Sequence, residues 1–262
     1  MRKKIIILYS FSLLCLIFAL FLCFRVYKIR RPYPTMKVNT SHGEVIVDNH
    51  KIYCANISDK PIINLAEPVY LATSGDVTSH SGEELILAVG DSGRDKKKYF
   101  VCVAIEEGKG KVVAKSPADI YNPWKFIIAD TNLDGKLDLA CGVKKEAPLH
   151  PVFCKRMFFF GIDEEKQKFY PIFLFSRLSS RLEDFTFADV NGDGKDEVIA
   201  LLWKTAQERC ILCYRWIGNG LEVISESLDI HGNKIDADKN NIILEYESIP
   251  KEEFFQSLKL IP

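Results

Sequence analysis

Two loops of this chain repeat one arrangement of oxygen-bearing side chains. Each loop has oxygen side chains at positions 1, 3 and 5, a glycine at position 6 that permits a sharp turn, and a further acid at position 9. With the backbone carbonyl of position 7 and water, this set offers the six or seven oxygens that Ca²⁺ requires. The expected ligands are Asp130, Asn132, Asp134, the Lys136 carbonyl and Asp138 in one loop, and Asp189, Asn191, Asp193, the Lys195 carbonyl and Glu197 in the other.

Each loop brings three carboxylates together, and their mutual repulsion favours a bound cation. An Asx-rich turn that binds nothing is the alternative for either loop alone. Two copies in the same register, both ending in an acid, favour two calcium sites. The loops are not EF-hands, because that motif needs Glu at position 12, where Cys141 and Ala200 stand here.

A degenerate third copy begins at Asp76 and ends with Glu84 at position 9. Thr78 and His80 replace the Asn and Asp of the other copies, so we expect no metal there. The three copies start 54 and 59 residues apart, and each is followed by short runs rich in β-branched and aromatic residues. Such runs predict antiparallel strands, about four in each period.

Four strands in a period of this length are typical of a propeller blade, and such sheets must stack on one another to bury both faces. We therefore expect an all-β fold, in the form of a small β-propeller-like repeat domain of about four or five blades. An open β-solenoid or a sandwich is the alternative.

The pattern D-x-N-x-D-G-x-x-[DE]-[LV], entering a strand at this period, resembles the FG-GAP/VCBS repeats of integrin-like β-propellers. The resemblance covers roughly residues 70–205, and the two complete loops carry it. In that family the loops bind calcium between strands of a blade. The resemblance therefore implies calcium ligation by the side chains named above, whereas the copy at 76–84 departs from the pattern.

The N-terminus contains twenty consecutive residues without a charge, 5–24. A helix of this length spans roughly 30 Å, the thickness of a bilayer core. A cleaved signal peptide is the alternative, but the stretch is long and lacks the small residues of a cleavage site. We predict a membrane anchor (1–31, with the transmembrane helix at 5–24), a proline-containing linker (32–43) and the repeat domain (44–262). The tail sequence KEEFFQSLKL is expected to form a short helix.

Charge is distributed unevenly along the chain. Residues 1–31 carry seven of the 35 basic residues and no acid, so residues 32–262 have 28 basic and 35 acidic residues, a net charge of −7. A domain of that sign repels phosphate backbones, so nucleic acid is not an expected partner. Basic residues flank both ends of 5–24, and the positive-inside rule is nearly balanced. The short N-terminal tail and the calcium loops favour a domain outside the cytoplasm.

The cysteines and histidines do not suggest catalysis. Cys102, Cys141 and Cys210 lie in apolar runs typical of strands, so we expect them to be buried and free of disulfides. A strand would direct the side chains of Cys210 and Cys213 to opposite faces, which argues against zinc or redox chemistry. The histidines lack ligand spacing and are expected at the surface, and the acid pairs at 106–107 and 164–165 are expected in solvated turns.

No catalytic residue and no organic cofactor site is predicted. The expected function is that of a membrane-anchored, extracytoplasmic binding or scaffold module for an unknown extracellular protein or glycan. The alternative is an enzyme that cleaves polysaccharides, a lyase or hydrolase, with its site at the propeller mouth, since propeller enzymes assemble sites from distant residues.

Overall fold

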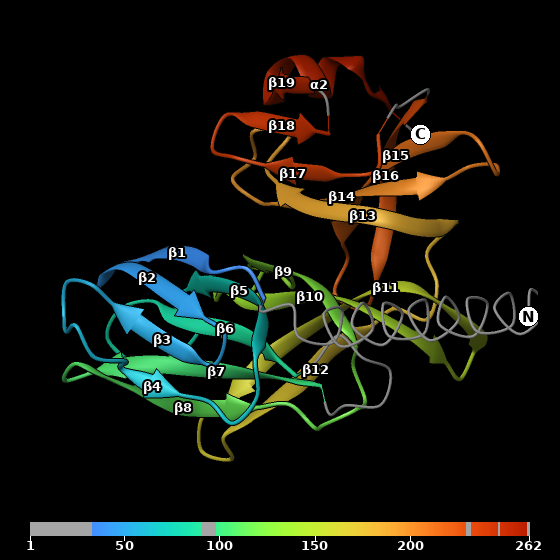
Figure 1. The fold of residues 1–262 in the computed structure, drawn as a ribbon. Helices are drawn as coiled ribbons and strands as arrows, with labels where there is room; N and C mark the ends of the chain where they lie inside the picture. Colours follow the sequence, from blue (N-terminus) through green and yellow to red (C-terminus); the bar gives the residue numbers. More distant parts are fainter. Residues whose placement is uncertain (1–32, 91–97, 229–231, 246, 261–262) are drawn as a thin grey trace, which may run out of the picture. The chain divides into compact units, whose positions relative to one another are not determined.

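The computed structural model describes residues 33–90, 98–228, 232–245 and 247–260. The chain divides into residues 1–34 and 35–262, and the second unit is described below. Its described residues form strands β1 to β20 and one short helix, α2 (Figure 1). The all-β prediction is therefore confirmed. Helix α2, Lys251–Ser257, lies in the tail where a short helix was predicted.

The first sheet of this unit has four strands in the order β1-β2-β3-β4. Their bounds are Met36–Thr40, Gly43–Asp48, Lys51–Cys54 and Ile63–Asn64. Strand β1 lies within the segment expected to be a linker. It forms there because Met36 and Val38 alternate toward the apolar core while β1 pairs with β2.

The second sheet has eight strands in the order β5-β6-β7-β8-β12-β11-β10-β9. It consists of two antiparallel four-stranded meanders joined by one parallel bridge between Lys115 and Lys168. The edge strands β5 and β9 also contact each other, so this sheet is nearly closed. The bounds of β5 to β12 are Val69–Gly75, Glu84–Val89, Tyr99–Glu106, Lys109–Lys115, Pro123–Ala129, Asp138–Ala147, His150–Asp163 and Lys168–Leu174.

Two further sheets complete the unit, a five-stranded one (β13-β14-β15-β16-β20) and a three-stranded one (β17-β18-β19). In Figure 1 they carry the orange to red colours of the C-terminal third of the chain. The bounds of β13 to β16 are Arg181–Ala188, Glu197–Trp203, Arg209–Trp216 and Leu221–Leu228, and those of β17 to β20 are Ile235–Ala237, Asn241–Leu244, Glu247–Pro250 and Lys259–Leu260.

Four apolar cores lie between consecutive groups of strands. The first joins β1–β4 to β5–β8, the second joins β5–β8 to β9–β12, the third joins β9–β12 to β13–β16, and the fourth joins β13–β16 to β17–β19 and α2. The first strands of these groups, β1, β5, β9, β13 and β17, contact one another in series. Each group of strands thus buries at least one face against the next group, as the repeat predicted.

The described cysteines follow the sequence prediction. Cys102, Cys141 and Cys210 are buried and form no disulfide. Cys210 packs into the third core and Cys213 into the fourth, so their side chains lie on opposite faces of β15.

The predicted membrane span at residues 5–24 lies outside the described residues. Within the part of the chain that the structure describes, no helix has the length and apolar character needed to cross a membrane.

Candidate functional site

The three copies of the repeated loop occupy the same place in three consecutive meanders. They connect the first strand of a meander to its second, β5 to β6, β9 to β10 and β13 to β14. In each hairpin the acid at position 9 pairs with the residue just before the loop. These pairs are Gly75 with Glu84, Ala129 with Asp138, and Ala188 with Glu197. The copies are therefore structurally equivalent, including the degenerate one.

The loop at 130–138 is folded around the carboxylate of Asp130. Its two oxygens accept hydrogen bonds from the backbone amides of Asp134 (3.0 Å) and Gly135 (2.8 Å). The side-chain oxygen of Asn132 accepts from the Asp134 amide (3.1 Å), and Asp134 accepts from the Lys136 amide (2.9 Å). These bonds turn the oxygens of positions 1, 3 and 5 toward the same short stretch of backbone.

The loop at 189–197 repeats this pattern. Asp189 accepts hydrogen bonds from the amides of Gly192 (2.7 Å) and Gly194 (2.9 Å). Asn191 accepts from the Asp193 amide (2.8 Å), and Asp193 accepts from the Lys195 amide (2.9 Å). The two loops that were predicted to bind calcium thus share a side-chain arrangement as well as a sequence.

Their backbones share a left-handed conformation at positions 4 and 6. In the first of them, Leu133 has φ 60° and Gly135 has φ 87°, and in the second, Gly192 has φ 78° and Gly194 has φ 82°. This conformation favours glycine because it crowds the Cβ atom of other residues. Leu133 is the only one of these four residues that is not a glycine.

The acids at position 9 differ from the other acids of the loops because they are buried. Asp138 is 5 % exposed and Glu197 is 2 % exposed. Asp138 accepts a hydrogen bond from the Thr131 hydroxyl (2.8 Å), and Glu197 accepts from the Val190 amide (3.1 Å) and the Asn191 side chain (2.6 Å). Neither carboxyl has a basic partner within ion-pair distance among the described residues.

Burial changes the acidity of both carboxyl groups. It raises the pKa of Asp138 to about 6 and the pKa of Glu197 to about 7. The charges of Asp134 and Asp130 add to this effect at Asp138, and those of Asp193 and Asp189 add to it at Glu197. In both loops the ionised form of the position 9 acid therefore lacks a compensating positive charge.

The donor set of both loops is chemically suited to calcium. It consists of carboxylate, amide and carbonyl oxygens without nitrogen or sulfur, which suits a hard cation. A carboxylate oxygen that accepts one backbone hydrogen bond keeps a lone pair for a metal. Within the described residues, no group of three or more His, Cys, Asp or Glu side chains is preassembled to hold a metal ion. Asp134 and Asp193 are exposed, and each accepts a hydrogen bond from within its own loop.

The degenerate loop at 76–84 is organised differently. Glu84, 1 % exposed, accepts hydrogen bonds from the Val77 amide (3.0 Å) and the Thr78 hydroxyl (2.5 Å). At position 5, His80 lies 2.9 Å from the Thr78 hydroxyl, 3.2 Å from Glu106 and 3.6 Å from Glu164. Neither position 4 nor position 6 is left-handed.

Three residues of this loop's surroundings were expected to be ordinary surface groups. His80 was expected to be exposed, and Glu106 and Glu164 were expected in solvated turns. Glu106 and Glu164 do lie at hairpin turns, and their side chains are 42 % and 34 % exposed. The imidazole of His80 is only 21 % exposed and contacts both acids, and Glu164 also accepts hydrogen bonds from the Ser79 amide (2.8 Å) and hydroxyl (2.6 Å). The contacts between Ser79 and Glu164 span 85 residues of sequence, which no local spacing reveals.

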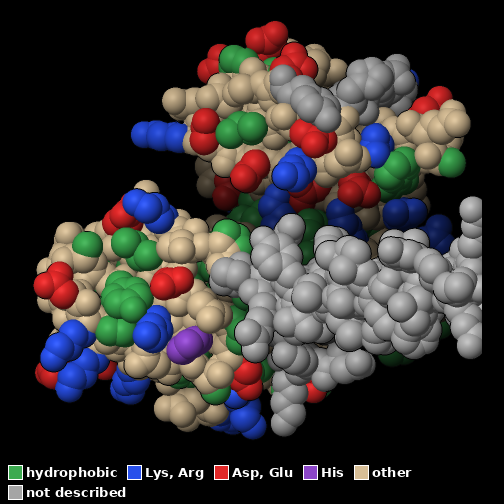
Figure 2. All heavy atoms as spheres, in the orientation of Figure 1, with side chains coloured by type: hydrophobic (Ala, Val, Ile, Leu, Met, Phe, Trp, Pro, Cys, Tyr) green, Lys and Arg blue, Asp and Glu red, His purple; other side chains and the backbone are tan. Residues whose placement is uncertain are grey.

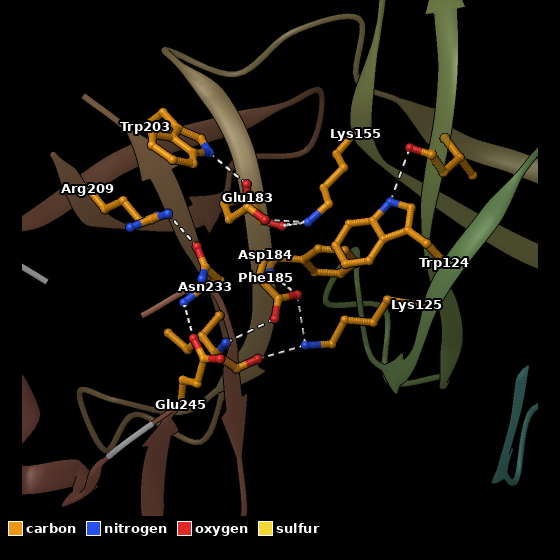
Figure 3. A network of polar contacts seen from close by, with 12 residues as sticks. Trp124, Lys125, Lys155, Glu183, Asp184, Phe185, Trp203, Arg209, Asn233 and Glu245 are labelled. Atoms are coloured by element: carbon orange, nitrogen blue, oxygen red, sulfur yellow. Dashed lines mark hydrogen bonds and ion pairs between the residues drawn. The ribbon is translucent and has the colours of Figure 1, made fainter. Parts of the chain in front are cut away.

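A second polar cluster joins the meanders β9–β12 and β13–β16 to strand β17 (Figure 3). Lys125 on β9 forms an ion pair with the buried Asp184 on β13 (3.0 Å) and donates to the Ile235 carbonyl (2.7 Å). The Ile235 amide donates to Asp184 (2.9 Å), and Lys155 forms an ion pair with Glu183 (2.6 Å). Because these groups satisfy one another, we interpret the cluster as a structural link between sheets.

The chain matches no protein-family model and no curated protein sequence.

Proposed function

We propose that this protein is a membrane-anchored, extracytoplasmic β-propeller of about four or five blades that binds two calcium ions and serves as a binding or scaffold module for a protein or glycan. The anchor is residues 5–24. The propeller interpretation is supported by the stack of four-stranded meanders whose first strands contact in series.

One observation carries the calcium assignment. The position 9 acids of the two complete loops, Asp138 and Glu197, are buried, form no ion pair with a basic side chain among the described residues, and have raised pKa values. A buried ionised carboxylate is costly unless it is paired or ligates a metal. A calcium ion bound in each loop would supply the missing positive charge. Asp130 and Asp189 would then hold it from the strand before the loop, and Asp138 and Glu197 from the strand after it.

Calorimetric titration of calcium into the full chain in a neutral detergent tests the assignment. We expect two bound ions per chain. Asp134→Ala and Asp193→Ala should each remove one site, because each deletes one ligand and leaves the other loop intact. Asp76→Ala is the matched control and should leave two. Absence of binding at millimolar calcium would remove the metal from this proposal.

The anchor and the location have a separate test. The full chain should pellet with membranes, and protease added outside intact cells should digest residues 32–262. Recovery of full-length protein in the cytosol would contradict both parts.

A further inference from the structure

A pocket of about 310 Å³ lies where strand β11 meets the chain segment between β12 and β13. Its lining includes five basic side chains and no acidic one. This is unexpected for a domain with a net charge of −7. On the face drawn in Figure 2, wherever grey atoms do not cover it, acidic and basic side chains are interspersed. The basic lining residues are His150, Lys155, Arg156, Arg177 and Arg181.

Part of this positive charge is not neutralised by acids. Of the five, only Lys155 forms an ion pair with an acid among the described residues, with Glu183. Arg177 and Arg181 are exposed at the pocket and form no ion pair within the described part of the chain, although the charge of Arg181 also acts on Glu183 and lowers its pKa. An excess of unpaired cations in a concave site attracts an anion.

Arg156 shows that the positive charge is built into the fold. Its guanidinium is 3 % exposed, and it donates to the carbonyls of Lys145 (2.8 Å), His150 (2.8 Å) and Val152 (2.7 Å). No carboxylate pairs with it among the described residues. Arg156 thus fixes the tip of the β10–β11 hairpin while placing a desolvated positive charge in the pocket wall.

The same hairpin carries the most exposed apolar side chain on the described surface. Leu149 is 87 % exposed, Phe153 is 63 % exposed, and Val152, which also lines the pocket, is 51 % exposed. The remaining lining is largely apolar and includes Met157 and Leu178. An apolar tip beside basic side chains is typical of a surface that enters the boundary of an anionic membrane.

We propose that this pocket binds the phosphate group of an anionic phospholipid, with the tip of the β10–β11 hairpin inserted among the lipids beside it. A soluble phosphate would contact the basic side chains but not the exposed Leu149 and Phe153. An amphiphile contacts both, because its headgroup is anionic and its chains are apolar. A volume near 310 Å³ accommodates a headgroup and the first carbons of its chains. The inference stands apart from the calcium loops, which lie on other hairpins.

Cys154 provides a local readout of this pocket. It lines the pocket and is partly exposed, whereas the other described cysteines are buried. The full chain in neutral detergent is treated with a maleimide, and alkylation of the Cys154 peptide is followed by mass spectrometry. A peptide-level readout separates this site from lipids bound around the predicted anchor.

We expect short-chain phosphatidylglycerol to slow the alkylation of Cys154 and phosphatidylcholine to leave it unchanged. Arg177→Gln/Arg181→Gln should raise the lipid concentration needed for protection roughly ten-fold or more, since each basic residue near an anionic membrane contributes several-fold in affinity. Arg215→Gln, an exposed arginine on β15, is the matched control and should behave like the original protein. Circular dichroism verifies that each variant is folded.

Three outcomes would overturn the proposal. They are equal protection by both lipids, protection by glycerol phosphate at the same concentration as by the lipid, and a double variant that titrates like the original protein. The second outcome would identify a site for a soluble phosphate.

Discussion

The loop at 76–84 and the loops at 130–138 and 189–197 have the same register in the sheet and the same buried acid at position 9, but they differ at position 5. In the first, Glu84 receives a hydroxyl and an amide, and His80 occupies position 5 between Thr78 and two further acids. In the other two, Asp138 accepts a hydrogen bond from the Thr131 hydroxyl and Glu197 accepts from the Val190 amide, and position 5 is an exposed aspartate. The comparison teaches that one repeat can hold at position 5 either an imidazole that contacts neighbouring acids or an exposed aspartate.

The backbone conformation also differs between the two complete loops and the degenerate loop. The two complete loops have left-handed residues at positions 4 and 6, and the degenerate loop has neither. The comparison therefore predicts that only two of the three loops respond to calcium.

Removal of calcium should have the largest effect. With calcium near ~1 mM and a dissociation constant near ~0.1 mM, each site adds roughly 1.4 kcal/mol, so two sites add roughly 3 kcal/mol to the free energy of unfolding. For a domain of this size, chelation should lower the melting temperature by about 6–12 °C. Asp134→Ala or Asp193→Ala should each halve that response, and Asp76→Ala should not alter it. A melting temperature that does not change with chelator would contradict the predicted difference in calcium binding between the loops.

Magnesium provides the control for the type of ion. It prefers a smaller octahedral shell and keeps several waters, so it should restore little of the stability lost on chelation.

The pH dependence should have the next largest effect. Folding raises the pKa values of Asp138 and Glu197, so the folded, calcium-free protein holds more protons than the unfolded chain between about pH 4 and pH 7. Stability without calcium should therefore fall as the pH rises through that range, by about 2 kcal/mol after allowance for solvent screening.

Calcium should reverse this trend, because its ligands must be deprotonated. The increase in melting temperature on adding calcium should be large at pH 7.5 and small at pH 5. An increment equal at both pH values would contradict the role of these two carboxyl groups as ligands. Other titrating groups contribute equally to the melting temperature with calcium and with chelator, so their contribution cancels when the two values are subtracted.

The sequence could predict the local features of the loops but not their contacts with distant segments. The strands, the period and the equivalence of the three loops follow from spacing and apolar pattern, because each hairpin is local. The contacts of His80 with Glu106 and Glu164 do not, because they depend on how β7 and the β11–β12 turn come to lie beside the β5–β6 loop. The basic pocket was missed for the same reason. Strand β1 was missed because a proline-containing stretch precedes it.

His80→Ala tests the degenerate loop directly. It removes the group that contacts Thr78, Glu106 and Glu164, and we expect a loss of about 1 kcal/mol in the free energy of unfolding, a typical net value for lost hydrogen bonds. The loss should be the same with calcium and with chelator, as measured by urea denaturation. A loss that appears in only one of these conditions would show that this loop is coupled to the metal sites.

Leu133→Gly should have the smallest effect, and its sign is informative. Leu133 has φ 60°, at the position where the equivalent loop has Gly192. A left-handed residue with a Cβ atom costs roughly 1–2 kcal/mol, while glycine costs about 0.5–1 kcal/mol in backbone entropy, so the substitution should stabilise the protein by about 0.5 kcal/mol.

Gly192→Leu is the mirrored control for this substitution. A Cβ atom at Gly192 would meet nothing within 4 Å, so its cost should come from the backbone alone and should be a destabilisation of similar size. Paired urea denaturation of both variants in calcium measures the two changes together. If both substitutions destabilise the protein, the side chain of Leu133 contributes packing that outweighs its strained backbone, and the two loops are less alike than their shared dihedral angles indicate.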